Sequence, residues 1–176
     1  MNRNRLSRMT LSAMFLALAM LLPFITGQVP SIGNMLCPMH IPVLLCGFIC
    51  GPVYGGLVGF ISPVLRYILF AMPPLVPNGI PMSFELLTYG LVSGFLFQLL
   101  QRKTSCIYLS LLAAMIAGRV VWGFVKSLIL GLSGSQFTLS MFIAGALTNA
   151  IPGIILQLIL IPLLVMSISK FEKKNS

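Results

Sequence analysis

Residues 106–132 read CIYLSLLAAMIAGRVVWGFVKSLILGL, and this stretch decides the class of fold. About 20 consecutive, mostly apolar residues form a helix that crosses the hydrocarbon core of a bilayer. This run exceeds that length, and only Arg119 and Lys126 bring charge into it. The segment therefore predicts a transmembrane helix, and its two cations require a physical reason.

The same pattern recurs along the rest of the chain. The segments that approach a membrane-spanning length are Met9–Ile25, Leu36–Gly51, Val53–Met72, Met82–Leu100, Cys106–Leu132 and Leu139–Ile168. The second is short, which leaves a re-entrant segment open as an alternative to a crossing. We predict an all-α integral membrane protein with six transmembrane helices, forming a single domain over residues 1–176.

The composition excludes most other classes of protein. Hydrophobic residues make up 58% of the 176 residues and charged residues 7%, whereas a soluble domain carries about 25% charged residues. We therefore set aside a soluble enzyme, a disordered tail and a DNA-binding module. The net charge of +9 is explained more simply by membrane topology than by nucleic acid.

Basic residues gather at the two ends of the chain and in one connection. The basic tails are residues 1–8 and 169–176, and Arg102 and Lys103 lie between the fourth and fifth segments. The positive-inside rule places all of them in the cytoplasm, which requires an even number of crossings. The first apolar run resembles a secretory signal, but we interpret it as a retained span because no cleavage site closes it.

The connections predicted to lie outside carry no charge, and one of them, Ala71–Pro81, is rich in proline. They are Thr26–Met35, Ala71–Pro81 and Ser133–Thr138. Four prolines in Ala71–Pro81 enforce a stiff segment that is incompatible with a helix. We expect such apolar, stiff loops to cap a pocket, with plain connectors as the alternative.

Charged residues inside the predicted spans lie from the middle of the membrane outward. A charged side chain at the bilayer centre costs on the order of 3 kcal/mol. Arg66 and Glu85 lie near the outer ends of the third and fourth spans, and Arg119 and Lys126 lie in the fifth. An i, i+7 spacing places Arg119, Trp122 and Lys126 on one side of that helix. These positions predict a polar pocket that opens to the exterior.

The charges in this pocket do not balance. Glu85 neutralises one cation, most simply Arg66, and about two positive charges then remain. Arg matches a carboxylate with its planar fork and Lys supplies a point charge, so a small organic acid is the expected ligand. In the alternative interpretation, Arg66 and Lys126 reach the lipid headgroups and Arg119 bonds backbone carbonyls. Tyr89 and Trp122 stack on a ligand ring or simply pack.

The sequence contains no recognisable catalytic or nucleotide-binding motif. It has one histidine and no aspartate, and it lacks H-E-x-x-H, G-x-S-x-G and G-x-x-x-x-G-K-[ST]. We therefore predict a protein that is not an enzyme and carries no cofactor. Cys46, Cys50 and His40 could in principle meet a metal, but we interpret the thiols as small apolar residues of a membrane helix. Uphill transport would need a nucleotide-hydrolysing partner.

Several stretches resemble the substrate-binding S component of energy-coupling factor (ECF) transporters. They are the Arg-rich start leading into Ala13-x-x-x-Ala17, the run Pro38-Met-His-Ile-Pro-Val-Leu-Leu-Cys-Gly-Phe-Ile-Cys-Gly51, and the run from Gly59-Phe-Ile-Ser-Pro-Val-Leu-Arg66 to Phe84-Glu-Leu-Leu-Thr-Tyr-Gly90. The resemblance implies a vitamin-binding subunit in a bacterial-type plasma membrane. It also implies two ABC-type ATPases and a transmembrane coupling subunit, which docks at Ala13 and Ala17, a small-x-x-x-small pair.

The resemblance places the ligand under the loops after the first and third helices and between helices four to six. The expected substrate-binding residues are Asn34, His40, Arg66, Asn78, Glu85, Tyr89, Arg119, Trp122, Lys126 and Asn149. A positive pocket favours an anionic vitamin, with pantothenate first and biotin or a folate as alternatives. A neutral ligand such as pyridoxine, hydroxymethylpyrimidine or a queuosine precursor would use Trp122 and Glu85. The other functions considered are a stand-alone carrier or channel, and a membrane-embedded enzyme or assembly scaffold.

Overall fold

The computed structural model describes residues 5–25, 38–100, 105–132, 138–146 and 151–174. Almost all of these residues are helical, and no strand occurs among them. The helices are α1 (Arg5–Ile25), α3 (His40–Cys50), α4 (Pro52–Phe70), the irregular turn η1 (Leu75–Gly79), α5 (Ile80–Leu99), α6 (Ser105–Leu132), α7 (Leu139–Ala146) and α8 (Ile151–Lys174).

Five of the described helical segments are long and apolar enough to cross a membrane. They are Arg5–Phe24, Pro52–Phe70, Leu75–Leu99, Cys106–Leu132 and Ile151–Ile168. The predicted all-helical fold is therefore confirmed for the described residues, and the length and composition of these five helices are consistent with an integral membrane protein. The helices also extend into both basic tails, because α1 begins at Arg5 and α8 continues to Lys174.

The second predicted crossing, Leu36–Gly51, corresponds to α3 (His40–Cys50), which is much shorter than a membrane span. Its 11 residues rise by about 16 Å at 1.5 Å per residue, roughly half of a hydrocarbon core. Every residue of α3 is buried, which explains why the segment is apolar on all sides. α3 is thus a central helix that contacts α1, α4, α5 and α8.

The last predicted span, Leu139–Ile168, is divided into two helices. α7 ends at Ala146 and α8 begins at Ile151. Pro152 is the second residue of α8, where its missing N–H leaves no intrahelical bond unmade. A single helix over the predicted range would also be about 45 Å long, well beyond the thickness of a bilayer core.

Helices α3, α4 and α5 approach one another through glycines. A Cβ atom on Gly55 would lie 2.6 Å from the Cα of Gly47, and one on Gly94 would lie 2.7 Å from the carbonyl oxygen of Gly47. A Cβ on Gly90 would overlap the backbone of Gly55. Without a hydrophobic driving force in lipid, helices associate through such close packing. These glycines therefore hold the three helices together and fix where their polar side chains meet.

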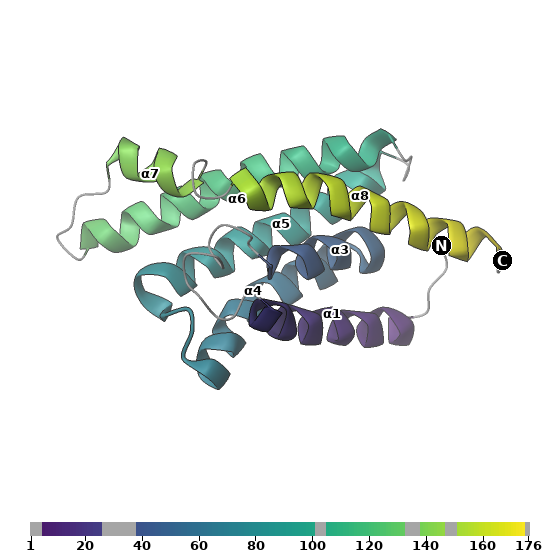
Figure 1. Cartoon of the computed structure of the whole chain (residues 1–176), viewed down its shortest axis with the longest axis horizontal. Helices are drawn as coiled ribbons and strands as arrows, with labels where there is room; N and C mark the ends of the chain where they lie inside the picture. Colours follow the sequence, from purple (N-terminus) through teal and green to yellow (C-terminus); the bar gives the residue numbers. More distant parts are fainter. Residues whose placement is uncertain (1–4, 26–37, 101–104, 133–137, 147–150, 175–176) are drawn as a thin grey trace.

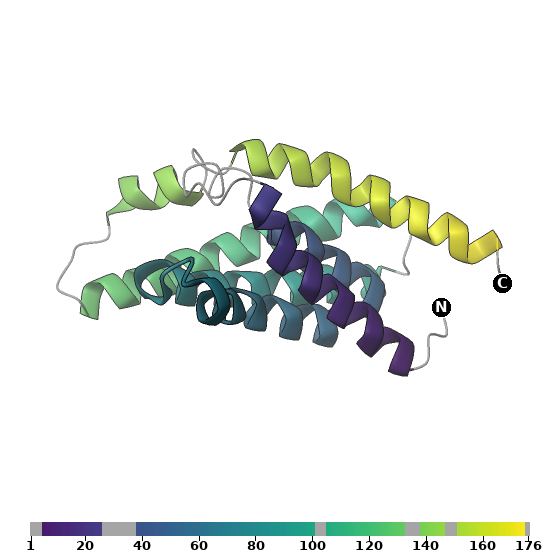
Figure 2. The same ribbon diagram turned by 60° about the horizontal axis from the view of Figure 1, so that its bottom comes forward.

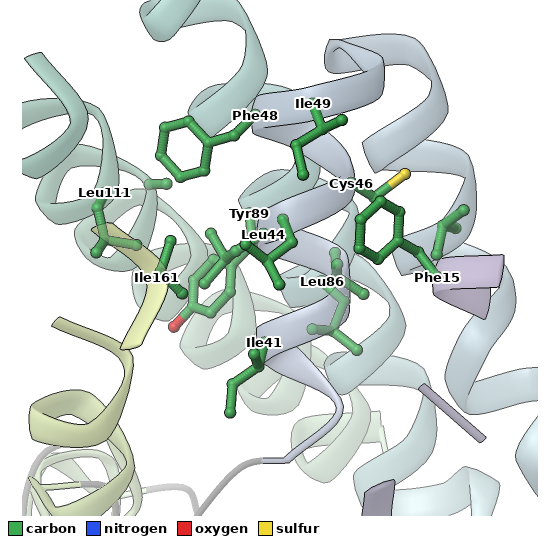
Figure 3. Packing of buried hydrophobic residues seen from close by; sticks show 14 of the residues in the cluster. Phe15, Ile41, Leu44, Cys46, Phe48, Ile49, Leu86, Tyr89, Leu111 and Ile161 are labelled. Carbon is green, nitrogen blue, oxygen red and sulfur yellow. The ribbon is translucent and has the colours of Figure 1, made fainter. Parts of the chain in front are cut away.

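The buried side chains form one continuous cluster around α3 (Figure 3). Phe15 reaches it from α1, Leu86 and Tyr89 from α5, Leu111 from α6 and Ile161 from α8. The opposite face of these helices exposes large apolar side chains. Those more than half exposed include Leu57, Ile68, Phe95, Ile116, Val120, Phe124, Ile159 and Leu163. Such an apolar exterior is suited to lipid and not to water.

The start of α1 and the end of α8 lie at the same end of the bundle (Figures 1 and 2). The turn η1 lies toward the opposite end, which we call the η1 end (Figure 1). From there α5 and α8 run in the same direction, and α6 returns toward it (Figure 1). Residues early in α5 and late in α6 therefore come together at the η1 end.

Candidate ligand-binding site

The carboxylate of Glu85 is the centre of a buried ionic cluster near the η1 end. Its side chain is 3% exposed, and its Oε1 lies 3.1 Å from Nη1 of Arg119 and 3.5 Å from Nε2 of His40. The three residues come from α5, α6 and α3. A buried carboxylate is tolerated only when it is paired in this way. The cluster therefore explains why Glu85 occurs in the fourth predicted span and why Arg119 occurs in the middle of the fifth.

This pairing differs from the simplest one that the sequence suggests. Arg66 does not contact Glu85; its Nη1 donates a hydrogen bond to the backbone carbonyl of Met20, at 2.9 Å. Its guanidinium carbon lies 5.3 Å and 5.5 Å from the ring centres of Phe24 and Phe70. A carbonyl near the end of a helix and two aromatic faces satisfy a cation without a carboxylate. Arg66 thus ties α4 to α1 and lies outside the cluster around Glu85.

Tyr89 lies one helical turn from Glu85, toward the centre of the bundle. Its ring packs edge-on against His40, with ring centres 5.2 Å apart, and it is 1% exposed. Gly118 faces this ring so closely that a Cβ there would overlap it. The absence of a side chain at Gly118 lets α6 approach α5, which brings the neighbouring Arg119 within reach of Glu85.

Lys126 lies closer to the η1 end than Arg119, two turns further along α6. Its Nζ donates a hydrogen bond to Oδ1 of Asn78 in η1, at 3.2 Å, and lies 4.7 Å from the ring centre of Trp122. The Trp122 ring in turn packs at 6.2 Å from Phe142 of α7. Lys126 therefore connects the turn after α4 to α6, and its partners among the described residues are neutral.

The structure also places the other predicted site residues. Asn34 and Asn149 lie outside the described residues. Ala13 and Ala17 are exposed on α1, beside Met14 and Leu18, which are 58% and 43% exposed. The opposite side of α1 enters the core through Phe15. The predicted docking pair therefore lies on an outward face, away from Glu85.

Gln157 is the largest of the buried polar residues that the sequence prediction missed among the described residues. Gln157 of α8 is 2% exposed, and its Oε1 forms no hydrogen bond to any described residue. The signal that could have found it is a single amide within the apolar run Ile-Ile-Leu-Gln157-Leu-Ile-Leu. An amide there is costly unless something binds it, just as for the charged residues.

No group of three His, Cys, Asp or Glu side chains among the described residues could hold a metal ion. The thiol of Cys46 lies 3.6 Å from the hydroxyl of Ser12, and Cys50 is buried in the same helix. His40 faces Glu85 instead of either thiol. Ionic, amide and aromatic side chains, and not metal ligands, thus gather in the described part of this region.

The sequence model of the family "ECF transporter, substrate-specific component" matches residues 7–165. This chain belongs to that family. The resemblance inferred from the sequence is thereby confirmed, and an ECF substrate-specific component is a transport subunit that resides in the membrane. Membership implies a small-molecule substrate and association with the ATPases and the T component of an ECF module. Searches of curated proteins and of solved structures found no match.

Proposed function

We propose that this ECF substrate-specific component captures a water-soluble vitamin with one negative charge, pantothenate in the first place, from the extracellular side. The observation that carries the proposal is the charge balance around Lys126. The chain has only two acidic residues. Glu85 is already bound by Arg119 and His40, and Glu172 lies near the end of α8, at the other end of the bundle (Figure 1).

Lys126 is therefore a cation without a carboxylate partner in a protein that must reside in a bilayer. The amide of Asn78 and the face of Trp122 hold it in place, but neither cancels its charge. A ligand carboxylate beside Nζ would do so, with a charge-assisted hydrogen bond. The proposed ligand position is thus between α6, η1 and the polar cluster around Glu85.

The size of this imbalance discriminates between vitamins. Arg66 is satisfied by the Met20 carbonyl and two rings, and Arg119 by Glu85, so one uncompensated cation remains instead of two. A single cation suits a monocarboxylate such as pantothenate or biotin better than a dicarboxylate such as a folate. A cationic vitamin such as thiamine would meet Lys126 with the same sign of charge.

The proposed topology has six passes, both termini in the cytoplasm and the η1 end outside. The shared position of the start of α1 and the end of α8 (Figures 1 and 2) supports an even number of passes, with α3 as the short return between α1 and α4. The basic residues of both tails then lie inside. The Ala13 and Ala17 face of α1, which is exposed, is the proposed contact with the transmembrane coupling subunit.

The test is a thermal unfolding screen of the detergent-purified chain without partners. The panel contains pantothenate, biotin, folate, thiamine, pyridoxine, hydroxymethylpyrimidine and a deazapurine precursor of queuosine. A vitamin at a hundred times its Kd should add about 2.7 kcal/mol to the free energy of unfolding. We expect pantothenate to stabilise the wild type and to lose most of this effect with Lys126→Met.

Each alternative has its own outcome in the same set of experiments. If only a neutral ring compound stabilises the wild type, and it stabilises Lys126→Met equally well, the ligand is not anionic. A neutral ligand stacked on Trp122 would then be the better proposal. If no vitamin of the panel raises the thermal stability of the chain, the vitamin-binding proposal is wrong. Uptake by proteoliposomes that contain this chain alone, without ATP, would establish a stand-alone carrier instead of a subunit.

A further inference from the structure

The amide of Gln157 is a buried polar group that neither the packing nor the cluster around Glu85 accounts for. It is 2% exposed, and its Oε1 has no hydrogen-bond partner among the described residues. A buried carbonyl without a partner loses its hydration and gains nothing in return. Leucine occupies both neighbouring positions in the sequence, so an apolar side chain would suit this helix better unless the amide has a use.

Gln157 lies on the side of α8 that faces the rest of the bundle. Gly153, Gln157, Ile161 and Val165 are all buried, and their spacing of four places them on one helical face. Ile161 belongs to the same cluster as Tyr89 (Figure 3). α8 contacts α3 and α6, the two helices that carry His40 and Arg119.

The depth of Gln157 in the bundle matches that of Glu85. α5 and α8 run in the same direction from the η1 end (Figure 1), and Figure 3 shows Ile161 at about the level of Tyr89. Gln157 is one turn nearer the η1 end than Ile161, and Glu85 is one turn nearer that end than Tyr89.

A second unpartnered group lies on a helix that contacts α8. His40, at the start of α3, is 2% exposed, and its Nδ1 has no hydrogen-bond partner among the described residues. Its Nε2 faces Glu85 at 3.5 Å. Two helices that contact each other thus each carry a buried hydrogen-bonding atom for which the described part of the chain provides no partner.

We propose that Gln157 is a specificity-determining ligand contact. With His40 it binds an uncharged hydrogen-bonding part of the vitamin, a hydroxyl or an amide, while Lys126 binds the carboxylate. This inference rests on the proposed function and adds a second recognition point on α8. A site built to hydrogen-bond a ligand group rejects analogues without that group, because its own buried polar atoms then remain unpaired.

Isothermal titration calorimetry of the detergent-purified full chain with pantothenate tests this inference. Gln157→Leu keeps the volume and removes the amide, so we expect pantothenate to bind about tenfold more weakly. The ligand-free melting temperature should stay the same or rise, because a buried amide oxygen without a partner among the described residues is lost. Gln157→Asn keeps the amide but shortens its reach, and should also weaken binding. Ser110→Ala is the matched control, since Ser110 is likewise buried and unpartnered among the described residues but lies two to three turns from Arg119 toward the other end of α6.

An analogue of pantothenate without hydroxyl groups separates a ligand contact from a structural role. The wild type should prefer pantothenate to this analogue about tenfold, and Gln157→Leu should lose that preference. Equal pantothenate affinities of the wild type, Gln157→Leu and Gln157→Asn would overturn the inference and leave the proposed function intact. If another vitamin of the panel binds the wild type, the same variants are titrated with it. If no vitamin of the panel binds, the proposed function and the inference fall together.

Discussion

The ion pair between Glu85 and Arg119 offers the sharpest test of the site. At 3.1 Å and an effective dielectric constant near 20, its Coulomb energy is about 5 kcal/mol, of which desolvation offsets a large part. Glu85→Gln removes the charge and keeps the shape of the side chain, but it takes the carboxylate away from Arg119, whose side chain is 15% exposed. Breaking a buried pair from one side costs about 3–5 kcal/mol.

The assay is thermal unfolding of the ligand-free chain in detergent, as a double-mutant cycle. A loss of 3 kcal/mol corresponds to a fall in Tm of roughly 6–12 °C for a chain of this size. Arg119→Met should destabilise similarly, and the double variant should cost at least about 2 kcal/mol less than the sum of the two. Glu172→Gln, at the other end of the bundle, is the control and should change little. Additive effects in the cycle would show that the two residues do not interact.

Three further predictions address packing and docking. Gly90→Ala places a methyl group against the backbone of α4 and should cost about 1–3 kcal/mol. Gly131→Ala, which would meet no atom of the described residues within 4 Å, should be neutral or slightly stabilising; equal melting temperatures of the two variants would refute the close contact at Gly90. Arg66→Gln should lower the melting temperature and leave vitamin affinity unchanged. A loss of affinity measured by calorimetry would show that Arg66 belongs to the ligand-binding site. Replacing Ala13 and Ala17 with Trp should abolish copurification of the ATPase module while vitamin binding persists, and normal copurification would refute the docking face.

The amino-acid sequence predicts the membrane helices well because their physical cause is local. An apolar run of sufficient length must be a helix in lipid, since every backbone polar group needs an internal partner. The sequence does not predict the length of α3, because a helix enclosed by protein and a helix enclosed by lipid are equally apolar. The end of α7 at Ala146 is similarly hidden, because the run from Leu139 to Ile168 carries no charge to interrupt it.

The partner of Glu85 illustrates a second limit of prediction from sequence. Arg66 and Arg119 both lie at depths from which an arginine could reach this carboxylate, so depth alone does not choose between them. The choice is made by helix contacts: Gly118 lets α6 approach Tyr89 and α5, which brings Arg119 to Glu85, while Arg66 faces the end of α1 and bonds the Met20 carbonyl. Lys126 is then left without an acid. The proposed anionic ligand is therefore favoured by this one lysine, whose direct partners among the described residues are neutral, and not by the total number of cations in the sequence.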